Sequence, residues 1–475
     1  MNQAAIQGDL ADEVGPPPSV RALRGASLCQ SLHWLASGRI GAAQLTQTYL
    51  DAIAAEDPQL NAYVHLNVEA KADAQAAAAR RASGKFGRLD GVPVAIKDNF
   101  DVAGLPTRAG LPAQREAAVR DAYVIAKLRG AGAVILGKTQ TSEGSLAATS
   151  ANPHAGAAHN PARRGYQAGG SSGGCGVAVA AGLCAVAIGS DSLGSIRIPA
   201  SYCGVFALKP TSGELSTHGM LSAARRLDSV GLMARSVDDL GVLLHVLRGH
   251  DPNDARSRRR RVDLALPDWE PSKLRVGVLD DLGAWGTEPG VSRAFERALM
   301  ALEHEIGNRR VVSFGDFPLQ RARRAAFFVI ETEMLATHAA ALADKAHPVS
   351  AELAKLLDYA RGKSAADYAA ADRLLDAAVV ESRRLFSEID VLVTPTTPQT
   401  AFPLEAAVPD NSGDFTCFAN FSGCPAVTIP MGNTSDGLPA GLQFMGPPGS
   451  DLRLLELAEV CAAALDATPA YPLGR

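Results

Sequence analysis

Several features that define other classes of protein are scarce or missing in this chain of 475 residues. Its seven cysteines are scattered and show no CxxC spacing, which argues against a zinc site or a disulfide framework. No apolar run approaches the ~20 residues that are needed to span a bilayer. Aromatic residues make up only 5% of the chain, and the net charge is −4. Because this charge gives no general attraction for nucleic acid or an anionic membrane, we expect neither as a partner, and no metal or cofactor is implied.

The N-terminus does not have the pattern of a signal peptide, because no basic segment is followed there by an apolar run. Acidic residues and Pro16–Pro18 are typical of a flexible tail, which we expect over residues 1–26. The scattered cysteines fit buried thiols in a reducing compartment. These observations predict a cytoplasmic protein.

One short basic segment, Arg256–Arg261, stands out from the acidic chain. It can be interpreted as an anion or nucleic-acid patch, or as part of a solvated linker over Asp251–Glu270. We favour the linker, because a single short run of arginines is a weak signal.

Hydrophobic periodicity predicts an α/β protein, with short apolar runs as strands and alanine-rich or 3.6-periodic segments as helices. The expected strands are Val92–Lys97, Ala133–Leu136, Ala185–Ile188, Arg275–Leu279, Val391–Thr394, Val427–Pro430 and Gly441–Phe444. The expected helices are Ser27–Glu56 with a break at Gly38, Val68–Ala82, Asp121–Gly130, Val177–Ala181, Val237–Arg248 and Ala351–Phe386 with a break near Gly362. Strands that alternate with helices favour a mostly parallel sheet covered on both faces.

Two glycine-rich loops carry serines 24 positions apart, Ser171 in Gly169–Gly174 and Ser195 in Asp191–Arg197. A phosphate-binding loop is excluded for the first, since no Gly-Lys-[Ser/Thr] ending follows it. The remaining functional interpretation of Ser171 is a hydroxyl relay between a base and a nucleophile.

Ser195 is the candidate nucleophile, because it follows a predicted buried strand, and ligand sites of open α/β sheets lie at the carboxyl ends of strands. The backbone N–H groups of Leu193, Gly194 and Ser195 can converge there on a developing oxyanion. The alternative is a glycine-rich turn with a capping serine.

Lys97 ends a predicted strand 74 positions before Ser171. Such a lysine is either an exposed cation or, if desolvation lowers its pKa, a general base. A histidine-based triad is the competing arrangement, but no histidine stands in a catalytic motif and GxSxG is absent. His154 and His159 lie near the Ser171 loop and are candidates for substrate contact.

These residues resemble the amidase signature family. Gly169–Gly174 matches its Gly-Gly-Ser-Ser-Gly-Gly core, Gly194–Ala200 its nucleophile motif and Gly91–Asp98 its lysine motif, with the family's spacings. The resemblance extends over about residues 27–470 and includes the segments Leu35–Ile53, Asp390–Pro395 and Gly437–Gln443.

The resemblance implies an α/β/α sandwich with a central mixed, mostly parallel sheet, forming a single domain over residues 27–475 with a signature core at about 85–235. It implies a Ser–cis-Ser–Lys triad in which Ser195 forms an acyl-enzyme, Ser171 passes the proton and neutral Lys97 is the base. Ser192, Leu193, Gly194 and Ser195 would supply the backbone oxyanion hole. Ser172, Asp191 and Arg197 would hold the two loops together. A homodimer is the expected oligomer, and a partner subunit is possible.

The chain departs from the family at Leu193, where a glycine is usual beside the oxyanion hole. If this position required a positive φ, leucine would be strained. We expect instead that the Leu193 side chain narrows or redirects the acyl pocket.

The leading function is an amidase that releases ammonia or an amine from a small amide. The alternatives are a hydrolase of a urea-type carboxylate such as allophanate or carboxybiuret, the glutaminase-type subunit of an amidotransferase, and an inactive scaffold of the same fold. Ala351–Arg373 does not resemble the corresponding segment of the amidotransferase protein. Arg163, Arg164, Arg225 and Arg226 are candidates for pairing with a substrate carboxylate.

Overall fold

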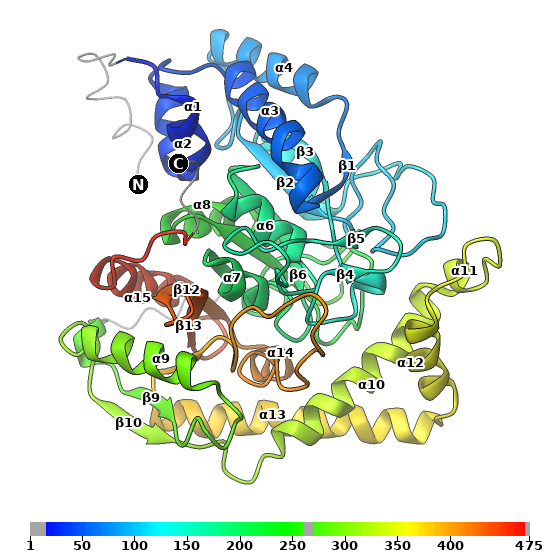
Figure 1. Ribbon diagram of the computed structural model, residues 1–475, viewed down its shortest axis with the longest axis vertical. Coiled ribbons are helices and arrows are strands. Elements are labelled where there is room, and N and C mark those ends of the chain that lie inside the picture. The colour runs from blue at the N-terminus through cyan, green and yellow to red at the C-terminus, as the bar shows by residue number, and fades with distance from the viewer. Residues whose placement is uncertain (1–15, 260–269, 471–475) are drawn as a thin grey trace.

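The computed structural model describes residues 16–259 and 270–470 (Figure 1). The start of the predicted tail, residues 1–15, lies outside this range, as do Arg260 and Arg261 of the basic segment. The end of the predicted tail contains a helix, α1 (Val20–Gly25), in which Leu23 is buried. Arg24 fixes this helix by donating hydrogen bonds to the carbonyls of Ala181 and Gly182. The single-domain organisation stays a prediction.

The described part of the predicted linker, 251–259, is largely exposed or half-buried, but it is anchored to the rest of the protein by polar contacts. Asp251 is buried and accepts a hydrogen bond of 2.8 Å from the Ser216 hydroxyl. Arg256 donates to the carbonyl of Arg226 over 3.2 Å.

An 11-stranded sheet forms the centre of the protein, with the order β1-β3-β2-β6-β8-β7-β12-β13-β11-β9-β10. Its strands are β1 (Tyr63–Leu66), β2 (Pro93–Lys97), β3 (Val134–Thr139), β6 (Val186–Asp191), β7 (Phe206–Lys209), β8 (Ser229–Ala234), β9 (Val276–Leu279), β10 (Arg309–Val312), β11 (Val391–Pro395), β12 (Ala426–Asn433) and β13 (Pro439–Met445). A separate small ribbon pairs β4 (Ala151–Asn152) with β5 (Gly156–Ala157).

The prediction of a mostly parallel sheet is wrong, although the α/β class and the mixed sheet are confirmed. Within the described residues, parallel pairing is confined to β3-β2-β6 and β11-β9-β10, and the remaining neighbours are antiparallel. The alternation of strands and helices suggested full crossovers everywhere. In fact β12 and β13 form a hairpin, whose turn includes Gly437 with a φ of +75°.

The helices lie along the sheet and at its two ends (Figure 1). They are α2 (Leu28–Ala36), α3 (Ala42–Leu60), α4 (Ala70–Ala82), α5 (Tyr123–Gly130), α6 (Gly173–Ala180), α7 (Arg197–Cys203), α8 (Val237–Leu247), α9 (Pro289–Ala301), α10 (Leu319–Thr337), α11 (Ala339–Leu342), α12 (Ala351–Arg361), α13 (Ala365–Glu388), α14 (Cys417–Ser422) and α15 (Asp451–Ala464), with short 3₁₀ turns at Glu143–Ser145 and Pro271–Lys273. No helix in the described ranges is both long and apolar enough to cross a membrane.

Every residue of β2, β3, β6, β7 and β8 is buried, so helices cover both faces of this part of the sheet, as predicted. The main hydrophobic core surrounds these strands. A second core joins α10, α12, α13 and α14 and includes Leu193. The predicted serine loops thus lie where the sheet meets a separate group of helices.

Candidate active site

Lys97 ends β2 and is fully buried, so the exposed-cation interpretation is wrong. Its Nζ lies 2.7 Å from Ser171 Oγ and 2.9 Å from Ser190 Oγ. Burial lowers the pKa of Lys97 to about 8, although neighbouring acidic groups act to raise it. On the order of a tenth of this amine is therefore neutral at pH 7, and this form is able to accept a proton.

Ser171 lies in the loop that leads into α6, and the Gly170–Ser171 peptide bond is cis, as the family resemblance implied. Ser150 holds this loop: its hydroxyl donates to the Gly169 carbonyl over 2.8 Å and accepts from the Gly173 N–H over 2.9 Å. Gly170 admits no side chain, because a Cβ there would overlap the backbone of Thr149. These contacts fix the Ser171 hydroxyl beside Lys97.

Ser195 follows β6, and its main chain is joined to the Ser171 loop by a hydrogen bond of 3.1 Å from the Ser172 N–H to the Ser195 carbonyl. The Ser172 hydroxyl donates to the Ser190 carbonyl over 3.1 Å and so ties the loop to β6 a second time. Ser195 is half-buried and lines a cavity. In the described residues the side-chain hydrogen bonds link Lys97 with Ser171 and do not extend to the Ser195 hydroxyl.

The four predicted oxyanion donors are not equivalent. Gly194 N–H donates to Asp191 Oδ1 over 2.7 Å, so this group is not available to a substrate oxygen here. The N–H groups of Ser192, Leu193 and Ser195 form no hydrogen bond with any described residue. Gly194 has a φ of +118°, whereas Leu193 is not among the residues with positive φ. Leucine at position 193 is therefore unstrained, and its side chain lines the cavity as expected.

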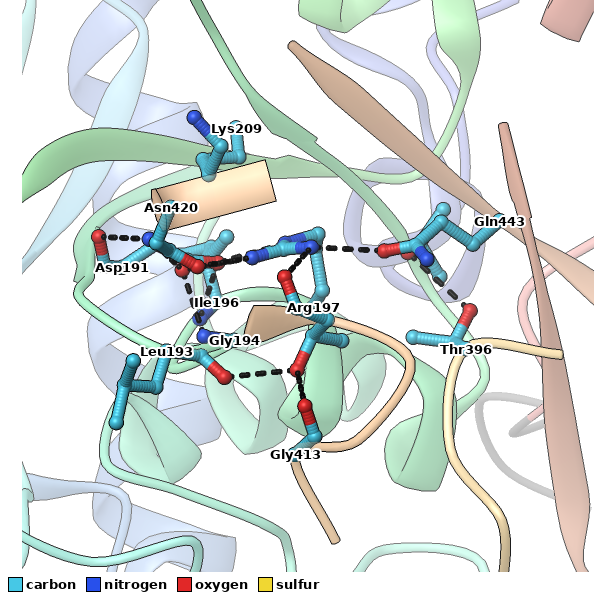
Figure 2. A network of polar contacts seen from close by, with 12 residues as sticks. Asp191, Leu193, Gly194, Ile196, Arg197, Lys209, Thr396, Gly413, Asn420 and Gln443 are labelled. Atoms are coloured by element: carbon cyan, nitrogen blue, oxygen red, sulfur yellow. Dashed lines mark hydrogen bonds and ion pairs between the residues drawn. The ribbon is translucent and has the colours of Figure 1, made fainter. Parts of the chain in front are cut away.

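Asp191 and Arg197, at the two ends of the segment that contains Ser195, form a buried ion pair (Figure 2). Arg197 Nε and Nη2 donate to the two carboxylate oxygens of Asp191 over 2.9 and 3.0 Å. Asn420, on α14, donates to Asp191 and accepts from Arg197, and Gln443, on β13, also accepts from Arg197. Burial alone would raise the pKa of Asp191, but the Arg197 charge and these hydrogen bonds lower it to about 2. Asp191 therefore stays ionised and orients Gly194.

Three polar residues of the site were missed in the sequence. Ser190 contacts Lys97 and also lies 3.0 Å from Asn99 Nδ2. Asp228 accepts hydrogen bonds from the hydroxyls of Ser192 and Ser222, and its burial raises its pKa despite these bonds. A signal was available for Ser190, which lies beside Asp191, and for Asn99, which lies two residues after Lys97. Asp228 carried no such signal, because it reaches the site through the folding of a distant loop.

The cavity in front of Ser195 has a volume of about 610 Å³. One wall includes residues of the two serine loops, and the other comes from α10, α12 and the loop before α14. Its apolar lining includes Leu146, Ile198, Phe327, Ile330 and Leu353. Glu143 is a buried residue of the lining that accepts from the Ser350 N–H over 2.9 Å and lies 2.7 Å from His154 Nε2. The size and mixed lining suit a small organic substrate.

The remaining candidates for substrate contact lie elsewhere. His154 reaches the cavity only through Glu143, and His159 Nδ1 accepts from the Gly165 N–H. The side chains of three of the four candidate arginines have other partners: Arg163 contacts the Asp436 carbonyl, Arg164 contacts Gln59, and Arg226 pairs with Asp372 and Asp376. None of the four arginines lines the cavity. Across residues 16–259 and 270–470 no group of three His, Cys, Asp or Glu side chains is arranged to hold a metal ion.

Comparison with known proteins agrees with this geometry. The model of the family described as Amidase matches residues 44–455. A glutamyl-tRNA(Gln) amidotransferase subunit of Chloroflexus aggregans is 32% identical over 472 residues, covering 91% of this chain and 95% of that protein. A structure from a vestigial protein complex that reveals the evolutionary origins of an s-triazine catabolic enzyme aligns with a TM-score of 0.86 at 31% identity, over 94% of this chain and all of the other.

A bacterial aryl acylamidase of the amidase signature family aligns with a TM-score of 0.85 at 25% identity, over 95% of this chain and 99% of the other. The family match thus covers both serine loops, the lysine strand and the C-terminal strands that support Arg197. From this match and the geometry together, the chain is a member of the amidase signature family, whose enzymes act on amide C–N bonds.

Proposed function

We propose that this protein hydrolyses the C–N bond of a small amide through an acyl-enzyme on Ser195. The observation that supports this most directly is the 2.7 Å contact between the buried Lys97 amine and the Ser171 hydroxyl, beside the cavity that Ser195 lines. A buried lysine with a lowered pKa, held against a serine, is a suitable base for nucleophilic catalysis.

In the proposed reaction, neutral Lys97 accepts the Ser171 proton while Ser171 accepts the proton of Ser195. The Ser195 oxygen then attacks the amide carbonyl carbon, and the carbonyl oxygen becomes an oxyanion. The N–H groups of Leu193 and Ser195, which have no hydrogen-bond partner among the described residues, would stabilise this charge, and one such donor contributes roughly 3–4 kcal/mol.

Collapse of the tetrahedral species breaks the C–N bond. The proton stored on Lys97 returns through Ser171 to the leaving nitrogen, which departs as ammonia or an amine. Water then attacks the acyl-enzyme with the same two groups acting in reverse, which releases the carboxylic acid and restores Ser195.

Two measurements test this function. A fluorophosphonate probe should label wild-type protein at Ser195 and leave Ser195→Ala unlabelled. Ammonia or amine release from a panel of primary amides, aryl amides and urea-type carboxylates should vanish in Ser195→Ala and fall at least about 10³-fold in Lys97→Ala. Full activity of Lys97→Ala would exclude it as the base, and an unlabelled, inactive wild type would favour the inactive scaffold.

The pH dependence gives a further check, with a definite sign. The active form of Lys97 is deprotonated, and its pKa is about 8. We therefore expect kcat/KM to rise with pH up to about 8 and then to level off. A rate that falls over this range would contradict a neutral lysine as the base.

A second candidate is the amide-hydrolysing component of an amidotransferase, which the likeness to the Chloroflexus aggregans protein favours. Such a protein would act with a partner subunit, whereas the free amidase is expected to be a cytoplasmic homodimer. Size-exclusion chromatography with light scattering, followed by the hydrolysis panel on the isolated chain, separates the two. A chain that is labelled at Ser195 but hydrolyses nothing alone would support the partner-dependent function.

A further inference from the structure

Two adjacent arginines of α10 line the cavity, but their guanidinium groups are engaged differently. Arg324 donates to both carboxylate oxygens of Glu331, over 3.0 and 3.3 Å, and lies 4.5 Å from the centre of the Tyr359 ring. Arg323 has one ionic partner in the described ranges, Asp414, whose Oδ1 lies 2.8 Å from Nε. Its two terminal nitrogens form no hydrogen bond with any residue of 16–259 or 270–470.

Asp414 explains the placement of Arg323. This carboxylate is only 1% exposed, and neither of its oxygens accepts a hydrogen bond in the described structure. Its charge is therefore compensated through Arg323. Because a guanidinium group is a planar fork, a partner at Nε leaves the edge formed by Nη1 and Nη2 available. That edge matches a carboxylate in a two-bond arrangement.

The pair is connected to the proposed reaction centre through a short loop. The Thr416 hydroxyl, two residues beyond Asp414, donates to the Leu193 carbonyl over 2.7 Å. Leu193, Ser195 and Arg323 line one cavity. A molecule of a few carbon atoms held by Arg323 would thus share this space with the nucleophile.

The carboxylates of the cavity wall do not cancel this cation. Glu143 is already engaged by Ser350 and His154. Glu352 and Asp410 are solvent-exposed, where water and salt screen their charges, whereas the Arg323 side chain is only 17% exposed. The positive charge of the mostly buried Arg323, with its unpaired donors, therefore outweighs the charges of these exposed carboxylates in attracting an anionic group.

Resting on the proposed hydrolysis at Ser195, we propose that Arg323 binds a carboxylate of the substrate. The substrate is then a small amide that also carries a carboxylate, with Arg323 setting the specificity. Phe327 and Ile330, on the same helix, supply apolar surface for the carbon chain between the two groups.

The test compares two amides of the same shape. Succinamate carries a carboxylate, and 4-methylpentanamide carries an isopropyl group in its place. We expect wild-type kcat/KM to be at least about 10-fold higher for succinamate, since a charged hydrogen-bonded pair gives roughly a 10- to 100-fold effect. Arg323→Gln should remove this preference, mainly through KM, and Arg323→Lys should restore part of it. Arg321→Gln, on the exposed side of the same helix, is the matched control and should keep the preference.

Because Arg323→Gln leaves Asp414 buried without its partner, the double variant Arg323→Gln/Asp414→Asn is measured beside it. A binding test that needs no turnover follows fluorophosphonate labelling of Ser195 in the presence of succinate. Succinate should slow labelling of wild type and of Arg321→Gln, and leave the labelling rate of Arg323→Gln and of the double variant unchanged.

Equal kcat/KM for the two amides, or labelling that succinate does not slow, overturns the role of Arg323 while the labelling itself upholds the hydrolase. Protection that persists in Arg323→Gln also overturns it. Absence of labelling in wild type instead overturns the proposed function, and the carboxylate inference with it.

Discussion

At the scale of single residues, the effect of Ser190 on the pKa of Lys97 can be measured directly. Its hydroxyl lies within 2.9 Å of Lys97 Nζ and 3.0 Å of Asn99 Nδ2. As an acceptor it stabilises the ammonium form of Lys97, so its removal should lower the pKa of that lysine further. We predict that Ser190→Ala reduces kcat about 10-fold and moves the acidic limb of kcat/KM to lower pH.

Ser190→Thr, which keeps the hydroxyl, should recover most of the rate and the wild-type pH dependence of kcat/KM. A loss of rate in Ser190→Ala with an unchanged pH profile would show that the serine acts only by packing. Thermal unfolding of both variants, followed by circular dichroism, distinguishes a change in the site from a change in stability.

The residues that could be predicted from the sequence are those in continuous motifs. Lys97 and Ser171 were expected to cooperate, and the structure places their polar atoms in contact. Arg323 and Asp414 could not be found in this way, because a helix and a loop 91 positions apart bring them together. Their pairing depends on tertiary packing, which leaves no local pattern in the sequence.

At the scale of elements, the sequence located most strands and helices but not their directions. Val427–Pro430 and Gly441–Phe444 were recognised as strands, yet their antiparallel hairpin was not. A run of buried residues predicts a strand whatever the direction of its neighbour, because both directions bury the same side chains. The prediction of parallel neighbours nevertheless holds around Lys97, because β2, which ends at this lysine, pairs in parallel with β3 and β6.

Helix α12 provides a prediction at this scale. Glu143 accepts from the N–H and hydroxyl of Ser350, the residue that caps α12, and so joins this helix to the 3₁₀ turn Glu143–Ser145 beside the cavity. Replacement by glutamine removes the charge that the helix N-terminus favours, a contribution of about 0.3–1 kcal/mol. We predict that Glu143→Gln increases hydrogen exchange of the first turn of α12.

Glu352→Gln is the comparison for this experiment, because Glu352 also places a carboxylate at the first turn of α12, but this carboxylate is exposed and forms no hydrogen bond or ion pair with any described residue. Equal exchange in the two variants would mean that Glu143 does not hold the helix. Faster exchange confined to Glu143→Gln would show that the Glu143–Ser350 contact stabilises the first turn of α12 beside the cavity.

At the scale of the whole molecule, the Asp191–Arg197 pair connects parts of the chain that are more than 200 residues apart (Figure 2). It joins the loop after β6 to α14 and to β13. The sequence motif contains Asp191 and Arg197, and Gln443 ends a segment that resembles the family, but no pattern connected Gln443 or Asn420 with this pair. A buried ion pair adds little net stability, whereas removal of one partner costs about 3–5 kcal/mol, because the other charge is left uncompensated.

We therefore predict that Arg197→Met lowers the free energy of unfolding by about 3–5 kcal/mol and that Asp191→Asn/Arg197→Met is less damaged than the single variant. The pair also has a pH signature. Since folding lowers the pKa of Asp191 from 3.8 to about 2, it contributes ~2 kcal/mol above pH 4, and this stability is lost as the pH falls toward 2. Urea unfolding at pH 6 and pH 3 measures both effects. If the double variant is as unstable as Arg197→Met, or keeps the wild-type dependence on pH, the pair does not act as the link between the serine loop and the C-terminal strands.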